Sequence, residues 1–308
     1  MAEHTRVDEF LTSLIAICKP LDSFEMPLLD AHGATLSQDV FAGERLVMKA
    51  GSRIRSTQIG LAASIGLDHL PTRPHPRVVV MSAGPDLVEP GKTLKGDEEF
   101  ETNSWMLTTA VREVGAVAYR VHSIPDDEAQ LQNLIEDQLV RADLIIISGE
   151  RHDDSFDLIT RTISNMGEIT TVDMAIEMSG RHNFGLIGPD KTPIITLPGD
   201  PIAAYISFEL FVRPMIRTML GAATIHRPSV KAKLEKAIES SDGMRSYIRA
   251  AISEDGKSVL PLLSQGSSAQ DEQATLSDAN AFIAVPEGDL NIAAGSYVTV
   301  VVLERRYI

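Results

Sequence analysis

Between residues 77 and 220, short runs of β-branched apolar residues alternate with segments of helical periodicity. No other feature of the sequence limits the possible folds as strongly. The pattern predicts strands at 77–82, 116–122, 143–148, 169–172, 184–187 and 194–197 and helices at 103–113, 126–141, 155–165 and 202–220, with a kink or restart at Pro214. Such alternation is typical of a largely parallel sheet covered by helices on both faces. We therefore predict a three-layer αβα domain.

Ligands of such sheets bind at the carboxyl ends of the strands. Three loops qualify, at residues 83–86, 149–154 and 198–200. The third belongs to a compact strand, turn and helix at 192–205, in which Asp200 is expected to cap the helix and Pro201 to open it. A helix N-terminus attracts anions, but a capping carboxylate occupies the same N–H donors. This corner alone therefore does not decide between a structural role and a ligand site.

The flanking segments differ from this central domain. Apolar residues at helical spacing predict a helix over 6–19, and a second helix is expected at 55–65. Three prolines within residues 71–76 predict a stiff linker. After Gly221, short strands separated by turns predict an all-β domain. We expect an N-terminal α+β segment at 1–73, the α/β domain at 74–222 and the β domain at 223–308.

Charge and cysteine content exclude several classes of function. The net charge of −15 disfavours nucleic-acid and anionic-membrane surfaces, which require clustered positive charge. The single cysteine, Cys18, permits neither an internal disulfide nor a thiolate metal site and is expected to be a buried apolar residue. No apolar run is long enough to span a membrane, and the N-terminus lacks the apolar region of a signal peptide, so a cytoplasmic protein is expected.

A series of short phrases follows in a fixed order from residue 82 onward. They are 82–91 (SAGPDLVEPG), 102–104 (TNS), 142–149 (ADLIIISG), 197–201 (LPGDP), 208–214 (FELFVRP), 279–281 (ANA) and 285–288 (VPEG). In this order and spacing they resemble the molybdopterin molybdenumtransferase family, which includes the bacterial MoeA proteins and the E domain of gephyrin. The resemblance covers about residues 77–305 and, more weakly, 6–73. It implies a MogA/MoeA-like α/β domain, and a homodimer formed through the N-terminal segment, a remnant of the family's first domain.

The resemblance also implies a reaction and a site. Members of the family insert molybdate into adenylylated molybdopterin and release AMP, with Mg²⁺ held by carboxylates. By match to the family's motifs, Asp86 and Asp157 would be catalytic. Cofactor-binding roles would fall to Gly84, Ser148, Gly149, Gly180, Arg181, Pro198, Gly199 and Asp200. The metal ligands are not identified. Neighbouring residues rarely converge on one ion, so His152 and the adjacent aspartates do not predict a metal site.

The sequence departs from the family pattern at this site. The family's inserted domain and its motif are absent, because residues 38–41 run directly into 42–46. Glu150 and Asp154 replace two glycines of the loop after 143–148, and the basic loop at 178–182 retains one of two cations and neither proline. Ala83 replaces a hydroxyl residue, and Asp200 replaces an asparagine. Added acids repel phosphate, so a catalytically impaired site is expected.

Two functions remain open from the sequence. One is a divergent molybdenumtransferase that uses adenylylated molybdopterin and Mg²⁺. The other is a non-catalytic scaffold, similar to gephyrin, that needs no cofactor. A scaffold would bind a peptide or protein partner in the groove between the α/β and β domains. Whether any transferase activity remains depends on how much positive charge the pocket holds.

Overall fold

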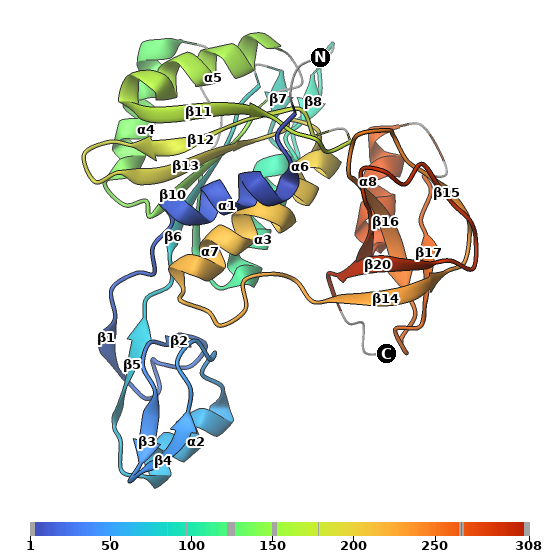
Figure 1. Ribbon diagram of the computed structural model, residues 1–308. Helices are drawn as coiled ribbons and strands as arrows, with labels where there is room; N and C mark the ends of the chain where they lie inside the picture. Colours follow the sequence, from blue (N-terminus) through green and yellow to red (C-terminus); the bar gives the residue numbers. More distant parts are fainter. Residues whose placement is uncertain are drawn as a thin grey trace.

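The computed structural model describes residues 4–84, 86–96, 98–121, 127–149, 153–177, 179–264, 266 and 268–304. Three parts are visible in Figure 1: an N-terminal lobe, a central α/β domain and a β-barrel beside that domain. None of the described helices combines the length and apolar character needed to cross a membrane.

The α/β domain is built on a sheet of six described strands in the order β11-β12-β13-β10-β6-β9. Their bounds are β6 (Arg77–Ser82), β9 (Val117–Val121), β10 (Leu144–Ser148), β11 (Gly167–Asp173), β12 (Arg181–Ile187) and β13 (Thr192–Leu197). The four strands β13, β10, β6 and β9 are parallel, whereas β12 is antiparallel to both of its neighbours. Ser148 is in register with Ser82 on one side and Leu197 on the other, so three carboxyl ends meet at one edge.

Helices cover both faces of this sheet, as predicted. One face packs against α4 (Glu128–Leu139) and α5 (Asp153–Met166), and the other against α1 (Val7–Ile17), α3 (Asn103–Val114) and the helices after β13. Successive residues of β10 point to opposite layers: Ile145 and Ile147 join the first core, and Leu144 and Ile146 join the second. This two-sided burial explains the continuous apolar run in the strand.

The helix predicted at 6–19 is confirmed as α1, but it packs with the α/β domain. Its apolar face at Val7, Phe10 and Leu14 is buried in the same core as β6 and β10. The predicted division at residue 73 placed this helix in the N-terminal segment, whereas its buried side chains belong to the core of the α/β domain. Cys18 is buried, as expected, and burial raises the pKa of its thiol to about 12.

The predicted interruption at Pro214 is confirmed. The chain forms α6 (Pro201–Ser207), a π-helical segment (Phe208–Val212) and α7 (Arg213–Met219). Proline lacks an amide hydrogen and clashes with the carbonyl four residues earlier, so the regular ladder cannot continue through it. The widened π-helical turn accommodates this defect before α7 begins.

The N-terminal lobe comprises β1 (Phe24–Pro27), β2 (Thr35–Leu36), β3 (Val40–Ala42), β4 (Arg45–Met48), α2 (Ser56–Ser64) and β5 (His69–Arg73). The prediction of a linker from residue 71 was wrong for 71–73, because β5 is the central strand between β1 and β2. Pro71 still accepts a hydrogen bond from the Ser37 amide through its carbonyl. Only Gly43 and Glu44 separate β3 from β4, so no inserted domain lies between them.

The C-terminal part is a closed barrel of β14 (Ser229–Leu234), β17 (Ser258–Pro261), β16 (Ser246–Ile252), β18 (Ala281–Val285) and β20 (Tyr297–Val302). A small pair, β15 (Ile238–Glu239) and β19 (Asn291–Ile292), accompanies it. The barrel also carries a helix that the sequence pattern did not predict, α8 (Ala269–Asp278), which packs against α6. This helix brings barrel residues to the edge of the α/β domain.

A polar cluster fastens the barrel to the α/β domain. The Arg245 backbone pairs with Ile176, and its guanidinium contacts Asp8 of α1 at 3.2 Å and Glu287 of the barrel at 3.1 Å.

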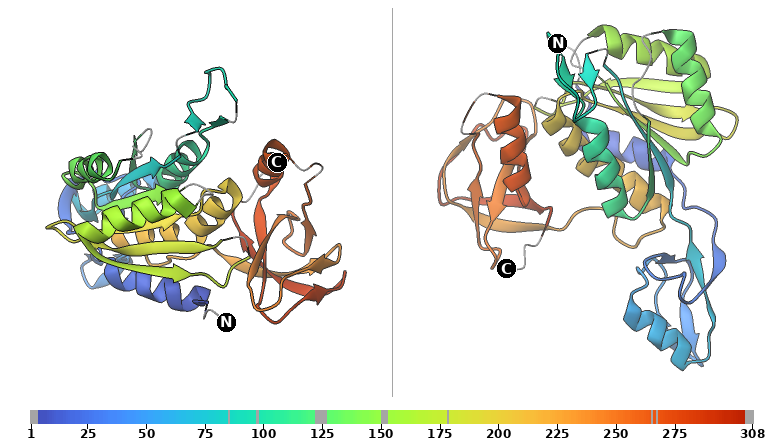
Figure 2. Two further views of the ribbon diagram at one scale, coloured as in Figure 1. Left: turned by 90° about the horizontal axis from the view of Figure 1, so that it is seen from above. Right: turned by 180° about the vertical axis from the view of Figure 1, so that it is seen from behind.

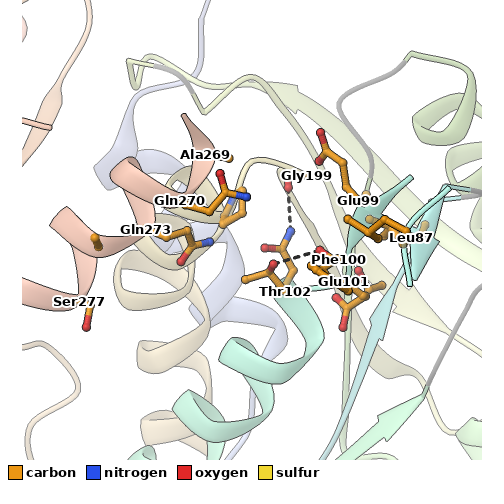
Figure 3. Close-up of a pocket in the computed structure, with 17 residues that line it drawn as sticks. Leu87, Glu99, Phe100, Glu101, Thr102, Gly199, Ala269, Gln270, Gln273 and Ser277 are labelled. Atoms are coloured by element: carbon orange, nitrogen blue, oxygen red, sulfur yellow. Dashed lines mark hydrogen bonds between the residues drawn. The ribbon is translucent and has the colours of Figure 1, made fainter. Parts of the chain in front are cut away.

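On the α/β domain, β7 (Leu87–Val88) and β8 (Glu99–Phe100) form a short pair that projects from the body in Figure 2.

Candidate functional site

A cavity of about 850 Å³ lies where the carboxyl ends of β6, β10 and β13 meet α8 of the barrel. Its wall combines the strand-end loops, the β7–β8 segment, the start of α3 and one face of α8. The lining residues are Ser82, Ala83, Leu87, Leu94, Glu99, Phe100, Glu101, Thr102, Asn103, Gly149, Gly199, Pro201, Ala269, Gln270, Gln273, Ala274 and Ser277. This is the edge at which ligands of open α/β sheets bind.

Asn103, the first residue of α3, ties two of the strand-end loops together. Its Nδ2 donates to Ser148 Oγ and to the Gly199 carbonyl, at 2.8 Å each. Ser148 in turn donates to the Pro198 carbonyl at 3.1 Å. Asn103 is only 6% exposed, and its Oδ1 has no hydrogen-bond partner among the described residues. The loops are therefore held by one amide that still has a free acceptor.

Glu101 gives the cavity wall a buried carboxylate. It is 3% exposed, and it accepts hydrogen bonds from the Ser104 amide at 2.7 Å and from the Ser104 hydroxyl. The carboxylate therefore occupies a position at the N-terminus of α3 that could otherwise bind an anion. Glu99, the second acid of the lining, is exposed.

Four of the predicted site residues lie at or directly beneath the cavity. Gly149 and Gly199 line it, while Ser148 and Pro198 belong to the hydrogen-bonded layer under Asn103. The structure therefore brings together residues from two of the three predicted loops. Their roles in binding remain predictions.

Asp200 caps α6, as the sequence predicts. Its Oδ1 accepts hydrogen bonds from the amides of Ile202 and Ala203 at 3.0 Å each, and Pro201 begins the helix. The cap occupies the donors that an anionic ligand would use. These contacts of Asp200 are those of a helix cap, and its predicted role in ligand binding remains a prediction.

The predicted residues of the first loop lie beside the cavity and do not line it. Gly84 is buried, and its carbonyl accepts a hydrogen bond from the Leu87 amide at 3.3 Å. Asp86 is exposed, and its backbone carbonyl accepts a hydrogen bond from the Glu99 amide at 3.0 Å. Both residues thus support the β7–β8 segment through their backbones.

Three further predicted residues form a separate group. Arg181 Nη1 lies 3.8 Å from Asp157 Oδ1, and the guanidinium lies over the Phe156 ring, 4.4 Å from its centroid. Gly180, directly before Arg181, has a positive φ of 60°, which explains the preference for glycine in this turn. None of the three lines the cavity. The predicted cation and catalytic acid therefore contact each other outside the cavity wall.

The predicted acidic loop lies partly outside the described residues. Glu150, Arg151 and His152 belong to that part, so their contribution to the charge of the site remains a prediction. Among the residues that the structure does describe, no three His, Cys, Asp or Glu side chains gather closely enough to hold a metal ion. The described residues therefore do not identify the ligands of a metal ion.

A buried histidine lies next to the Gly180–Arg181 turn. His182 Nε2 is 3.2 Å from Ser207 Oγ, and its ring packs edge-on against Phe10 and Phe211. Burial lowers the pKa of His182 from 6.5 to about 4. The imidazole is therefore neutral at pH 7 and adds no positive charge to the site.

Three residues of the cavity wall were not among the predicted site residues. Asn103 lies in the TNS phrase, so its position was marked, although its role was not. Glu101 precedes that phrase and gave no separate signal. Gln273 lies on α8, whose only sequence signal was the Ser268–Asp271 capping box.

Comparisons with known proteins match both domains that form the cavity. A family model described as "Probable molybdopterin binding domain" matches residues 80–218, and one described as "MoeA C-terminal region (domain IV)" matches residues 231–303. Molybdopterin molybdenumtransferase 1 of Mycobacterium tuberculosis (strain ATCC 25618 / H37Rv) is 32% identical over 277 residues, which cover 89% of this chain and 65% of that protein. Molybdopterin molybdenumtransferase 2 of the same strain is 33% identical over 275 residues, covering 87% and 66%. The chain thus spans just under two thirds of the length of these relatives.

A solved structure extends the likeness to the fold. The crystal structure of a molybdopterin biosynthesis MoeA protein from Pyrococcus horikosii matches with a TM-score of 0.82 at 19% identity, covering 98% of this chain and 100% of that one. A molybdenum cofactor biosynthesis protein from Pyrococcus furiosus matches with a TM-score of 0.75 at 22% identity, covering 97% and 100%. The α/β class with a C-terminal β domain is therefore confirmed.

Proposed function

Because this chain resembles the molybdopterin molybdenumtransferase family in both its α/β domain and its barrel, we propose that it acts on molybdopterin in molybdenum cofactor biosynthesis. One observation carries the proposal. The cavity lies at the carboxyl ends of β6, β10 and β13, inside the segment matched by the molybdopterin-binding model, and α8 of the MoeA-type domain closes it from the other side. In the enzymatic form of the proposal, the substrate is adenylylated molybdopterin with Mg²⁺.

The proposal includes a weakened hold on the phosphate groups of that substrate. The described residues of the lining include two glutamates and neither lysine nor arginine. A hydrogen bond from a charged group contributes about 1.5–3 kcal/mol, so each missing cation removes a large part of phosphate affinity. Arg181 does not line the cavity and contacts Asp157. These features support a divergent site in which molybdate insertion is impaired.

The missing inserted domain supports the same conclusion. The β3–β4 turn consists of two residues, and the chain covers 65% of its relative's length. Any residues that the family's inserted domain supplies to a reaction are therefore not supplied from this position. The amides and glycines at the strand ends remain, and these suit binding better than group transfer.

Genetic complementation tests the proposal directly. The chain is expressed in a bacterial strain that lacks its own molybdenumtransferase, with molybdopterin molybdenumtransferase 1 of M. tuberculosis as the positive control. We expect the control, but not this chain, to restore molybdoenzyme activity. Calorimetric titration of the purified protein with adenylylated molybdopterin should show binding weaker than micromolar. Restored activity or micromolar binding would refute the impairment, and no binding at millimolar ligand would refute the action on molybdopterin.

The scaffold function is the alternative that the cavity also supports. Leu94 and Phe100, 38% and 44% exposed, give the groove between the α/β domain and the barrel an apolar rim that a peptide could cover. If the chain is a scaffold, the wild type should not bind molybdopterin. Phe100→Glu should then abolish the recruitment of a protein partner in cells. If the wild type binds molybdopterin, and Phe100→Glu abolishes that binding but leaves the recruited proteins unchanged, this alternative is excluded.

A homodimer formed through the N-terminal lobe is a further part of the proposal. The lobe exposes Phe24, Phe41 and Leu46 at 45%, 53% and 45%. Phe41 and Leu46 are paired across β3 and β4, and exposed apolar side chains that lie side by side are typical of an interface. Sedimentation equilibrium should give the mass of a dimer, and Phe41→Glu with Leu46→Glu should shift it to that of a monomer. A monomeric wild-type chain would contradict the proposed dimer.

A further inference from the structure

A second cavity, of about 560 Å³, lies between the α/β domain and the barrel. Residues of α3, α6 and α7 form one wall, and α8 with the residues that follow β20 forms the other. Gln273 and Ser277 of α8 line both this cavity and the one at the strand ends, so the helix borders both. None of the residues predicted to bind molybdopterin lines the second cavity. It is therefore a separate candidate for a binding site.

Arg213, the first residue of α7, brings an uncommitted guanidinium to the second cavity. Its side chain is only 17% exposed, and among the described residues it makes no hydrogen bond. Nε is closed to solvent and lies 3.9 Å from Glu209 Oε2, which is too far for a hydrogen bond. Nη1 and Nη2 are not closed off in this way, and the residue lines the cavity. A pair of unused N–H donor groups is therefore accessible from the cavity.

Glu209 does not neutralise Arg213, because its carboxylate is committed to Arg227. Arg227 donates to both of the carboxylate oxygens, from Nε at 2.7 Å and from Nη2 at 2.8 Å. Burial lowers the pKa of Arg213, the charge of Arg227 lowers it further, and Glu209 offsets only part of this. Two guanidiniums thus share one carboxylate, and one positive charge lacks a counterion of its own among the described residues.

The geometry of a guanidinium indicates which anion would satisfy it. Its N–H groups form a planar fork that matches the two oxygens of a carboxylate. Removing such a charged donor from water is unfavourable unless an acceptor replaces the water. No described side chain supplies that acceptor to Nη1 or Nη2 of Arg213. A ligand carboxylate in the second cavity would supply it.

The rest of the wall favours a single negative charge on an apolar body. Met106, Leu276 and Leu303 provide apolar surface from both domains. Glu113 and Glu304 also line the cavity, and both are exposed. Solvent and salt screen these two carboxylates, yet they repel a dianion such as phosphate more strongly than a monoanion. The lining therefore suits a small monocarboxylate better than a phosphate.

We propose that the second cavity binds a small monocarboxylic acid, with the carboxylate on Nη1 and Nη2 of Arg213 and the apolar body against Met106, Leu276 and Leu303. The ligand supplies the counterion that Glu209 does not. It contacts the α/β domain and the barrel together, so its binding stabilises their arrangement. The site is independent of the proposed action on molybdopterin, because it lies outside the strand-end cavity.

The experiment titrates the full chain at pH 7 by calorimetry with isocaproate and with isocaproamide. The amide keeps the apolar body and removes the charge. We expect the acid to bind at least tenfold more tightly than the amide and at least tenfold more tightly than inorganic phosphate, and to raise the melting temperature. Equal binding of acid and amide, phosphate binding as tight as that of the acid, or no binding of the acid at millimolar concentrations overturns the inference.

Two substitutions at Arg213 locate the carboxylate. Arg213→Met removes the fork and should weaken isocaproate binding at least tenfold. Arg213→Lys keeps the charge but cannot hold two oxygens in parallel, so it should weaken binding at least threefold. Arg112→Met is the matched control, because Arg112 is exposed on α3 and does not line the cavity, and it should leave the affinity unchanged within twofold. An unchanged affinity in Arg213→Met overturns the inference.

The ratio of acid to amide affinity separates ligand binding from a purely structural role of Arg213. If Arg213 holds the carboxylate, Arg213→Met should lower this ratio to about one. If Arg213 only supports the shape of the cavity, both affinities should fall together and the ratio should stay at tenfold, which overturns the inference. Arg213→Lys keeps a positive charge near Glu209 and breaks no described hydrogen bond, so the test does not depend on Arg213→Met folding.

Discussion

The contact between Glu209 and Arg227 should be a measurable part of what holds the barrel in place. Glu209 lies in the π-helical segment, and its side chain is 3% exposed. Arg227 donates to it from Nε at 2.7 Å and from Nη2 at 2.8 Å, and Nη1 donates to the Leu303 carbonyl at 2.6 Å. Burial lowers the pKa of Arg227, but the bonds to Glu209 more than offset this, so the pKa is raised. One arginine thus connects the α/β domain to the segments that enter and leave the barrel.

Arg227→Met removes both bonds and leaves a buried carboxylate. Breaking a buried ion pair costs about 3–5 kcal/mol, because the remaining charge is uncompensated. Arg213 Nε lies 3.9 Å from the same carboxylate and offsets part of the loss, so we expect the lower end, about 3 kcal/mol. The double variant Glu209→Met, Arg227→Met removes the orphaned carboxylate but also takes away the neighbour of Arg213, so it should lose about 1–2 kcal/mol relative to the wild type, less than the single variant.

Urea unfolding at pH 7 measures these differences. Circular dichroism reports the whole chain, and Trp105, the single tryptophan, reports the α/β domain by fluorescence. We expect a large positive coupling energy between the two positions. The assignment of this ion pair as a main support of the barrel would be refuted if Arg227→Met cost less than about 1 kcal/mol, or if the double variant were as unstable as the single one.

Three other substitutions follow from the structure. His182 has a pKa lowered from 6.5 to about 4, so the neutral ring stabilises the fold above pH 6.5 and this contribution is lost as the pH falls. Urea unfolding should show about 2 kcal/mol lost between pH 7 and pH 5, and His182→Gln should lack that part of the dependence. Asp200→Ala should cost about 1 kcal/mol by thermal unfolding, and Asp200→Asn, which keeps a capping oxygen, much less. A Cβ at Gly185 would lie 1.9 Å from the Glu168 carbonyl oxygen. Gly185→Ala should therefore lower the free energy of unfolding by about 3 kcal/mol, measured by thermal unfolding.

Strands buried on both faces were the most predictable part of the fold. In β10, every residue from Leu144 to Ser148 is buried, so the run of apolar residues marks the strand without any tertiary information. The capped corner at Asp200 was predictable for a similar reason, because the capping hydrogen bonds join residues two and three apart. Local chemistry decides both features.

The missed elements lack such local signals. Only Thr275 and Leu276 of α8 are buried, so this helix shows no apolar stripe and its polar sequence suits a loop equally well. In β5, Pro71 argued against a strand, yet tertiary pairing on both sides overrides that preference. Neither element could be assigned from hydrophobic periodicity.

The site was predictable as a place but not as a set of contacts. Parallel strands bring their carboxyl ends to one edge, so the three loops had to converge. The bonds from Asn103 to Ser148 and Gly199 span 45 and 96 positions of the chain, and no local pattern specifies them. Gln273 enters from another domain, which only the packing of α8 on α6 makes possible.

The charge at the start of α3 opposes phosphate binding at the cavity wall. A helix N-terminus attracts anions, and α3 begins at the cavity wall. Glu101 occupies that position and satisfies the Ser104 amide from within the chain, so an incoming phosphate would meet a buried carboxylate in place of a free N–H. Asn103, two residues further on, is uncharged, and its Nδ2 donates to Ser148 and to the Gly199 carbonyl. The start of α3 therefore holds the strand-end loops together and opposes an anion at the same point.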